Sequence, residues 1–364
     1  MMNVQTQKGI SLVELMISIT IGLILMTGVV QLFLTSRTTF STQQALARVQ
    51  ESGRLAMDFL GEDIRMAGFA GCNSRGLSQD SSLNPVDKKF KNYLNDENLL
   101  SFKFDVGIEG EDDVSANPPA GYPDDAIEGT DILVVRSAGG ISLGVPKPND
   151  ANNVYARYVS DVAPCGEEQT GSSGICSGDI LIIANCTNAI AFQATEVEGN
   201  ASTGEVRIAH GAGDNPGNRV VAWDVSDAVS SASFADDAQI FQMLTTVYFI
   251  AQGAGGIPSL WRSSNGLAAQ ELLEGVQDMQ LTYGVDSNSD GVPENYVDAG
   301  DLSSADAWAD VVSVRVALLV QSSEDNVLAE PQPYTFNGVT VNDPGDRRLR
   351  QTFESTVAVR SRVY

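Results

Sequence analysis

The sequence KGISLVELMISITIGLILMTGVVQLFL, residues 8–34, decides the fold of this chain. From Ile10 onward almost every side chain is apolar, and the single charge is at Glu14. A run of this length can cross a bilayer as one helix. Lys8 precedes it, and no small-residue cleavage site follows it. We therefore predict a retained membrane helix with a cytoplasmic N-terminus and the rest of the chain outside.

The predicted helix continues beyond the membrane segment. Apolar and small residues recur at spacings of three and four, which is typical of one buried stripe on an amphipathic helix. A continuous helix from about Ile10 to Met66 would be about 85 Å long. Glycines at 68 and 71 indicate its end. The stripe consists of Leu46, Val49, Gly53, Ala56, Leu60 and Ile64.

Glu14 is the unusual residue of the apolar run, because an unpaired carboxylate in hydrocarbon costs several kcal/mol. One interpretation is that it pairs with the amine of a neighbouring chain and fixes the axial register of packed helices. The other is that it interacts with the positive N-terminal end of its own helix. The residues around it favour the first interpretation.

Those residues, Lys8-Gly9-Ile10-Ser11-Leu12-Val13-Glu14-Leu15, resemble the class III signal of type IV prepilins. The resemblance implies cleavage by a prepilin peptidase between Gly9 and Ile10, N-methylation of Ile10, and pairing of Glu14 with a neighbour's N-terminal amine during filament assembly. We expect four segments: a leader at 1–9, a transmembrane half-helix at 10–34, an amphipathic half-helix at 35–67, and a periplasmic or extracellular head at 68–364.

Longer segments of the sequence resemble one family among the type IV pilus proteins. The segments ALARVQESGRLAMDFLGEDIRMAGFAGC (45–72), LLEGVQDMQLTYGVDSNSDG (272–291), WADVVSVRVALL (308–319) and RRLRQTFESTVAVRSR (347–362) resemble the PilW family of type IV pilus minor pilins. Residues 75–125 carry no such likeness. Gln31 stands where major pilins commonly have a proline, which favours an accessory subunit.

The PilW resemblance implies an accessory subunit near the filament tip, joined to other minor pilins and a tip adhesin, that primes assembly of the major pilin. It would lie in the bacterial inner membrane before assembly and in the pilus on the cell surface afterwards. Two alternatives stay open: a minor pseudopilin of a type II secretion system, resembling GspJ, and a membrane-tethered calcium-dependent binding module.

After Cys72 the sequence changes to short apolar runs bounded by Gly, Asn, Asp and Pro, which is typical of β-strands and turns. We therefore predict an α+β fold, with the long pilin helix packed on a β-sheet-rich globular head. The predicted strands span residues 131–136, 179–185, 189–195, 205–209, 219–223, 243–251, 279–285, 311–320 and 351–359.

The chain has four cysteines and one histidine, which argues against a zinc site and favours disulfides in an oxidising compartment. Cys165 and Cys176 enclose a Gly- and Ser-rich loop that closes easily. Cys72 would then reach Cys186 and staple the helix to the sheet. Four cysteines allow three pairings, and the sequence does not choose among them.

The stretch from Asp286 to Glu294 resembles the start of an EF-hand-type calcium loop. Asp286, Asn288, Asp290 and Glu294 supply side-chain oxygens, and Val292 supplies a backbone carbonyl. Position twelve is Val297 rather than Glu, although Asp298 could substitute for it. The alternative is an ordinary Asn/Asp/Gly turn between strands. Calcium is the only cofactor that the sequence suggests.

Composition excludes other functions. With 22 basic and 47 acidic residues the formal net charge is −25, so we expect no nucleic-acid partner. No nucleophile, base and orienting group can be nominated together, since His210 lies in an Ala-His-Gly stretch without a serine elbow. Acidic runs such as Glu111–Asp113 are interpreted as solvated loop charge. We therefore expect no catalytic residues and no enzyme.

Overall fold

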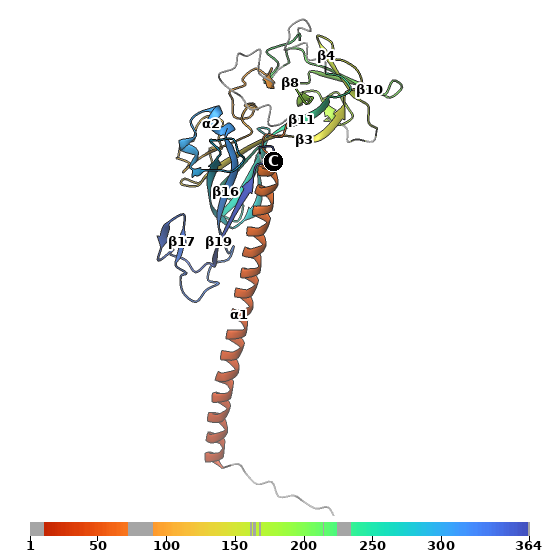
Figure 1. Ribbon diagram of the computed structural model, residues 1–364. Helices are drawn as coiled ribbons and strands as arrows, with labels where there is room; N and C mark the ends of the chain where they lie inside the picture. The colour runs from red at the N-terminus through yellow and green to blue at the C-terminus, as the bar shows by residue number, and fades with distance from the viewer. Residues whose placement is uncertain are drawn as a thin grey trace, which may run out of the picture.

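The computed structural model describes residues 11–71, 90–160, 162, 165–166, 169–213, 215–223 and 234–362. It shows one long stalk carrying a β-rich head (Figure 1). The stalk is helix α1 (Leu12–Met66), which ends where Gly68 adopts a φ of 68°. The predicted α+β class is thus confirmed. Gly9, Ile10 and Cys72 lie outside the described residues.

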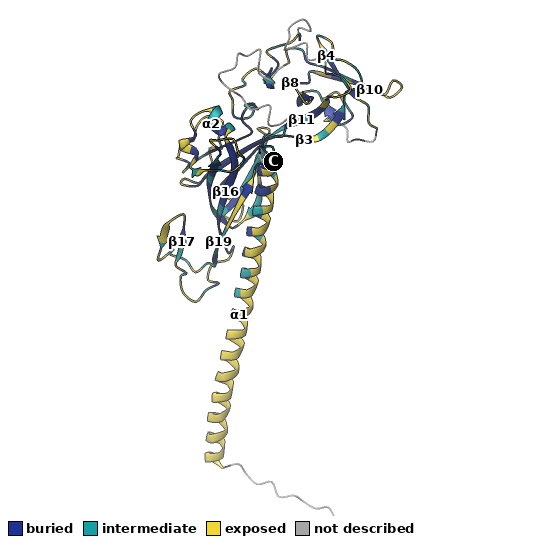
Figure 2. Ribbon diagram, viewed as in Figure 1, coloured by how far each residue is buried: buried dark blue, intermediate teal, exposed yellow. Residues whose placement is uncertain are grey.

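Helix α1 has two halves with different surroundings. Its first half is exposed along its whole length, whereas its second half presents one buried stripe to the head (Figure 2). The buried residues are Ala45, Val49, Gly53, Ala56, Leu60, Gly61 and Ile64. This is the predicted stripe with two differences: Ala45 replaces Leu46, which is half-buried, and Gly61 is buried as well.

A four-stranded antiparallel sheet packs on the second half of α1. Its strand order is β15 (Asn295–Val297), β14 (Val276–Val285), β16 (Val311–Gln321) and β19 (Arg350–Ala358). Strands β16 and β19 contact the helix. The 3₁₀-helix η2 (Ala299–Asp301) and the short helix α2 (Ala305–Ala309) connect β15 to β16. The main hydrophobic core lies between α1 and this sheet.

A larger sheet of eight strands forms the next layer of the head. Its main path is β1 (Phe90–Asn92), β8 (Ala189–Gln193), β7 (Ile180–Ala184), β11 (Gln239–Gln252), β12 (Pro258–Ser264) and β13 (Gln270–Glu274). Strand β3 (Ile132–Gly144) also pairs with β11, and β2 (Ile108–Glu111) pairs with β3. Only β1 and β8 are parallel among these pairs.

Three smaller sheets complete the described part of the head. At the end remote from the N-terminus of α1 lie β4 (Asn153–Arg157), β10 (Glu205–Ala209) and β9 (Glu196–Asn200), in that order (Figure 1). A second core cluster fills the space beneath them. Two hairpins join β5 (Gly171–Ser172) to β6 (Ile175–Cys176) and β17 (Tyr334–Phe336) to β18 (Val339–Val341).

One predicted strand is wrong. Residues 219–223 form no strand, because their amides bond to loops: Arg219 N donates to the Tyr93 carbonyl and Trp223 N to the Ala151 carbonyl. The apolar character of this segment instead reflects packing, since Trp223 is buried in the second core cluster. Strands β3 and β11 are also longer than predicted, since their added residues pair with one another.

Candidate functional site

The most conspicuous functional feature is the uncovered apolar half of α1. Leu12, Ile24 and Leu32 are 73%, 71% and 74% exposed, and the residues between them are exposed as well. Within the described residues, α1 is the helix long and apolar enough to cross a membrane. A helix that is apolar on every side requires lipid or other helices around it. This half of α1 is therefore an anchoring and packing surface.

Five hydroxyl side chains of this half-helix form hydrogen bonds inside the helix itself. The hydroxyls of Ser18, Thr20, Thr27, Thr35 and Thr38 each donate to the carbonyl four residues earlier, at 2.7 to 2.9 Å. Such bonds remove the need for a water partner in hydrocarbon. The hydroxyls therefore do not oppose burial of the helix in lipid or among other helices.

Glu14 is the exception on this surface. It lies in the first turn of α1, and no ion pair involves it within the described part of the chain. Carboxylates are favourable near a helix N-terminus, so the position itself suits the charge. The carboxylate is nevertheless available for a positively charged group on another chain.

The second half of α1 is held firmly beneath the head. Near its C-terminal end, Tyr248 Oη donates to Asp63 Oδ2 at 2.7 Å, and Ser361 Oγ donates to the Ala67 carbonyl at 2.6 Å. Halfway along, Gly53 lies so close to Phe353 that a Cβ there would overlap the ring. The position of the head relative to α1 is therefore fixed by packing as well as by hydrogen bonds.

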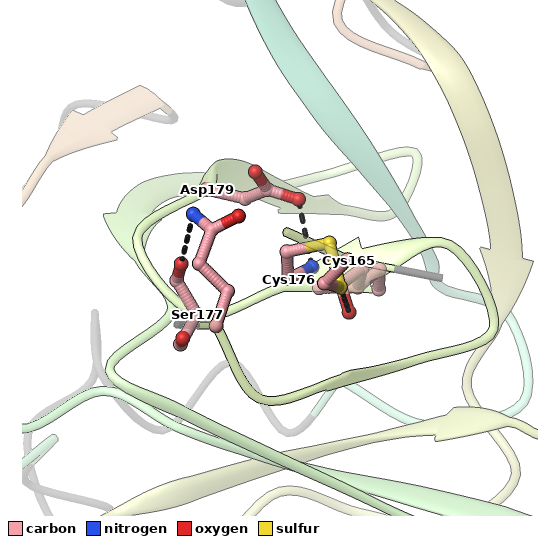
Figure 3. Close-up of a disulfide and its surroundings, with 6 residues drawn as sticks. Cys165, Cys176, Ser177 and Asp179 are labelled. Atoms are coloured by element: carbon pink, nitrogen blue, oxygen red, sulfur yellow. Dashed lines mark hydrogen bonds between the residues drawn. A yellow bond between two sulfur atoms is a disulfide. The ribbon is translucent and has the colours of Figure 1, made fainter. Parts of the chain in front are cut away.

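A predicted disulfide closes a loop in the upper head. Cys165 and Cys176 are bonded, with Cα atoms 5.7 Å apart (Figure 3). The Cys176 amide donates to Asp179 Oδ2 at 2.9 Å, and Gln169 Nε2 donates to the Ser177 carbonyl at 3.0 Å. These bonds fix the loop beside β6 and β7. The pairing of Cys72 with Cys186 stays a prediction, because Cys72 lies outside the described residues.

The predicted calcium loop joins β14 to β15. Oxygen atoms of Asp286, Asp290 and Glu294 lie within 4.8 Å of one another. Asp286 Oδ2 accepts the Gly291 amide at 2.7 Å, and Asn288 Nδ2 donates to Glu294 Oε1 at 2.5 Å. Burial acts to raise the pKa of Asp286, but backbone amides of the loop donate to it and hold that pKa below its usual range. The carboxylate is thus kept ionised, as a calcium ligand must be.

The remaining predicted ligands are placed less favourably. Val292 is exposed, and its amide donates to Asp290 Oδ1 at 2.8 Å. Val297, at position twelve, lies in β15 opposite Tyr283. Asp298 comes after β15, away from the loop, and acts electrostatically on Asp112 instead. The structure therefore does not bring Asp298 to the Asp286 cluster.

A second acidic cluster was missed by the sequence analysis. Oxygen atoms of Asp112, Asp113 and Asp131 lie within 4.8 Å of one another. Asp131 is 2% exposed and accepts the Asp113 and Leu281 amides at 3.0 and 2.6 Å. Burial raises the pKa of Asp131 to about 8, and Asp112 and Asp113 act in the same direction. The cluster thus lies at the start of β3, where Asp131 bonds to the backbone of β14.

The prediction that Glu111–Asp113 is solvated loop charge is therefore wrong in part. Glu111 is the last residue of β2, and only Asp113 of the three is fully exposed. Burial raises the pKa values of Glu111 and Asp112. The signal that was overlooked is Asp131, an acid directly before the apolar run ILVV, where the strand that it precedes carries it into the interior.

Comparisons with known proteins agree with the geometry of α1. Residues 5–30 match the prokaryotic N-terminal methylation motif, and residues 247–361 match the type IV pilus-assembly protein W (PilW) family. The second match covers the strands that pack beneath and beside the helix, from β11 to β19. No curated protein and no solved structure matches the chain.

Proposed function

The chain is a PilW-like type IV pilin and a minor pilin of the type IV pilus, and on that premise we propose that it lies near the filament tip, where it primes polymerisation of the major pilin. Other minor pilins and a tip adhesin are its neighbours in this proposal. The family is structural, so the chain is not an enzyme.

The observation that carries the proposal is the contrast between the two ends of α1. One half is apolar and exposed throughout, whereas the other is clamped beneath a head that extends beyond the helix C-terminus (Figure 1, Figure 2). The apolar half suits burial among other pilin helices. We infer that the upper head takes the space in which a subunit stacked above the helix end would lie. The tip is the position in a filament that lacks such a subunit.

Processing and placement follow the prepilin motif in this proposal. The peptidase removes residues 1–9, Ile10 becomes N-methylated, and Glu14 pairs with the N-terminal amine of a neighbour. Residues 10–34 span the inner membrane before assembly, residues 35–67 continue the helix, and the head at 68–364 faces the periplasm. Mass spectrometry of the mature N-terminus tests the first step, since a chain that still begins at Met1 would contradict it.

The test of assembly compares Glu14→Ala with Glu51→Ala in the native host. Both remove one exposed glutamate from α1, but only Glu14 lies in the apolar half. We expect Glu14→Ala to abolish surface pili and twitching motility, like a gene deletion, and Glu51→Ala to leave both intact. Normal piliation in the deletion strain would overturn the proposal. A defect in exoprotein secretion instead would assign the chain to type II secretion, as a GspJ-like pseudopilin.

We also propose that the Asp286 loop binds calcium, because the structure gathers Asp286, Asp290 and Glu294 and keeps Asp286 ionised. The missing ligand at Val297 predicts weak binding, with a Kd on the order of 10⁻⁴ to 10⁻³ M, as in extracellular calcium modules. Calorimetry should detect binding to wild type and to Asp124→Ala, an acid in a separate loop. Binding retained by Asp290→Ala would exclude this loop as the site.

A further inference from the structure

The outer face of the sheet β4–β10–β9 forms an open groove that no part of the function above uses. Its volume is about 880 Å³. Val154, Ala156, Val206 and Ile208 point inward into the second core cluster, so the alternate residues of the same strands face outward. The lining comprises Tyr155, Glu198, Gly199, Asn200, Ala201, Ser202, Thr203, Glu205 and Arg207.

An aromatic ring, a guanidinium and a carboxylate form one row across this face. Arg207 on β10 is in register with Tyr155 on β4 and with Glu198 on β9. Arg207 donates to Asn153 Oδ1 at 2.9 Å, to Glu196 Oε2 at 2.7 Å and to Glu198 Oε2 at 3.2 Å. Three neighbouring side chains therefore fix the guanidinium, and its Nη2 also lies 3.0 Å from Glu198 Oε2.

Tyr155 is fixed at the other side of the row. Its hydroxyl donates to Asp150 Oδ2 at 2.7 Å, and Lys147 Nζ lies 3.9 Å from the ring centroid. Lys147 in turn pairs with Glu205 at 2.6 Å. The ring, the guanidinium and the carboxylates of the groove are thus oriented before any ligand arrives, which lowers the entropic cost of binding.

Ion pairs occupy the charged side chains of this groove, but its carboxylates outnumber its cations, as they do in the whole chain of net charge −25. Glu196 and Glu198 pair with Arg207, and Glu205 pairs with Lys147. Three carboxylates thus share two cations, so an anionic ligand would meet an excess of negative charge. A neutral ligand rich in hydroxyls could instead donate to the carboxylates, accept from Arg207 and lay an apolar face on Tyr155.

We propose that this groove binds a neutral saccharide chain. The sugar hydroxyls bond to Arg207, Glu198 and the turn at Asn200–Thr203, and a pyranose packs on the face of the Tyr155 ring opposite Lys147. The groove lies at the end of the head remote from the membrane half of α1, where a glycan on another surface is accessible (Figure 1). The open shape suits a chain passing across the face rather than an enclosed monosaccharide.

The test uses full-length protein in detergent micelles, applied to an array of neutral, sialylated and sulfated glycans. We expect binding to neutral glycans, lowered about two- to tenfold by Tyr155→Ala, since an aromatic stacking contact typically contributes that much. Tyr155→Phe should keep most of the affinity. Tyr296→Ala is the matched control, because Tyr296 also has a cation against its ring, Arg315 at 4.2 Å, but lies on β15.

A second variant tests the groove independently, in case Tyr155→Ala does not fold. Ala201 is exposed in the β9–β10 turn and lines the groove, so Ala201→Trp fills the groove without disturbing the core. We expect it to lower binding as much as Tyr155→Ala does. The proposal is overturned if no neutral glycan binds, if only charged glycans bind, or if Ala201→Trp leaves binding to neutral glycans unchanged.

Discussion

Arg136 is the most constrained charged residue of the head. Its side chain is fully buried and donates to the Leu100 and Val106 carbonyls as well as to Glu109. Burial acts to raise the pKa of Glu109, but Arg136 and Lys103 together hold it below its usual value. Because the backbone of Arg136 also bonds to Gly68 and Gly107, this residue ties the end of α1 to β3.

Replacement of Arg136 should therefore be costly. Arg136→Met leaves Glu109 buried with one partner and two carbonyls without theirs, so we expect the free energy of unfolding to fall by about 3 to 5 kcal/mol. Arg48→Ala, which breaks an exposed pair with Glu324, should cost less than about 1 kcal/mol. Denaturant titration of both variants measures the difference. Equal losses of unfolding free energy in the two variants would show that the Arg136 network stabilises the head no more than an exposed ion pair does.

His210 is buried, and none of the described residues hydrogen-bonds to its ring nitrogens. It stacks on Trp223 with centroids 4.0 Å apart and meets Phe192 edge to face. Burial lowers its pKa from 6.5 to about 4. Because the unfolded chain takes up this proton first, the contribution of neutral His210 to stability is present above pH 6.5 and is lost as the pH falls toward 4.

The pH dependence of unfolding should reveal this histidine. We expect wild type to lose up to about 3 kcal/mol more than His210→Phe between pH 6.5 and pH 4. Asp131 is present in both chains, so its contribution to the pH dependence cancels in the comparison. Its pKa is raised to about 8, so Asp131 stabilises the folded state as the pH falls, whereas His210 destabilises it. Identical slopes for the two chains would mean that His210 is protonated equally in both states.

At the scale of elements, α1 was predictable because its two signals are local. An apolar run followed by a stripe with a helical period requires no knowledge of the rest of the chain. Strands such as β10 and β16 were found for the same reason, since their apolar residues mark the buried face. The short strands β9, β15 and β18 were missed, because cross-strand partners rather than a long apolar pattern of their own define them.

The packing of α1 against β19 gives a test at this scale. Gly53→Ala adds a methyl group that overlaps the Phe353 ring, so we expect a loss of about 1 to 3 kcal/mol despite a better helix propensity. Gly28→Ala makes the same change in the same helix where no atom lies within 4 Å. Thermal unfolding in detergent should show a lower Tm for Gly53→Ala alone. An unchanged Tm would mean that the helix and sheet separate easily.

For the whole molecule, the sequence predicted the anchor and the β-rich head but not how the head is divided. The junction between the two large sheets depends on Asp131, whose amide and carboxylate bond to Met279 and Leu281 of β14, about 150 residues away. Nothing local marks such a contact. The groove on β4–β10–β9 was likewise invisible, because its row of side chains comes from three separate strands.

The account of the whole molecule rests on one arrangement: an exposed apolar half-helix that enters the filament, and a head that overhangs the end of its helix. Insertion of an epitope tag at the exposed Gly255–Gly256 turn leaves both features intact. The most direct measurement is immunogold electron microscopy of sheared pili from a strain carrying that tag, with piliation first shown to be normal. We predict gold at one end of the filaments. Gold spaced along the shafts, or confined to the cell envelope, would contradict a minor pilin at the tip.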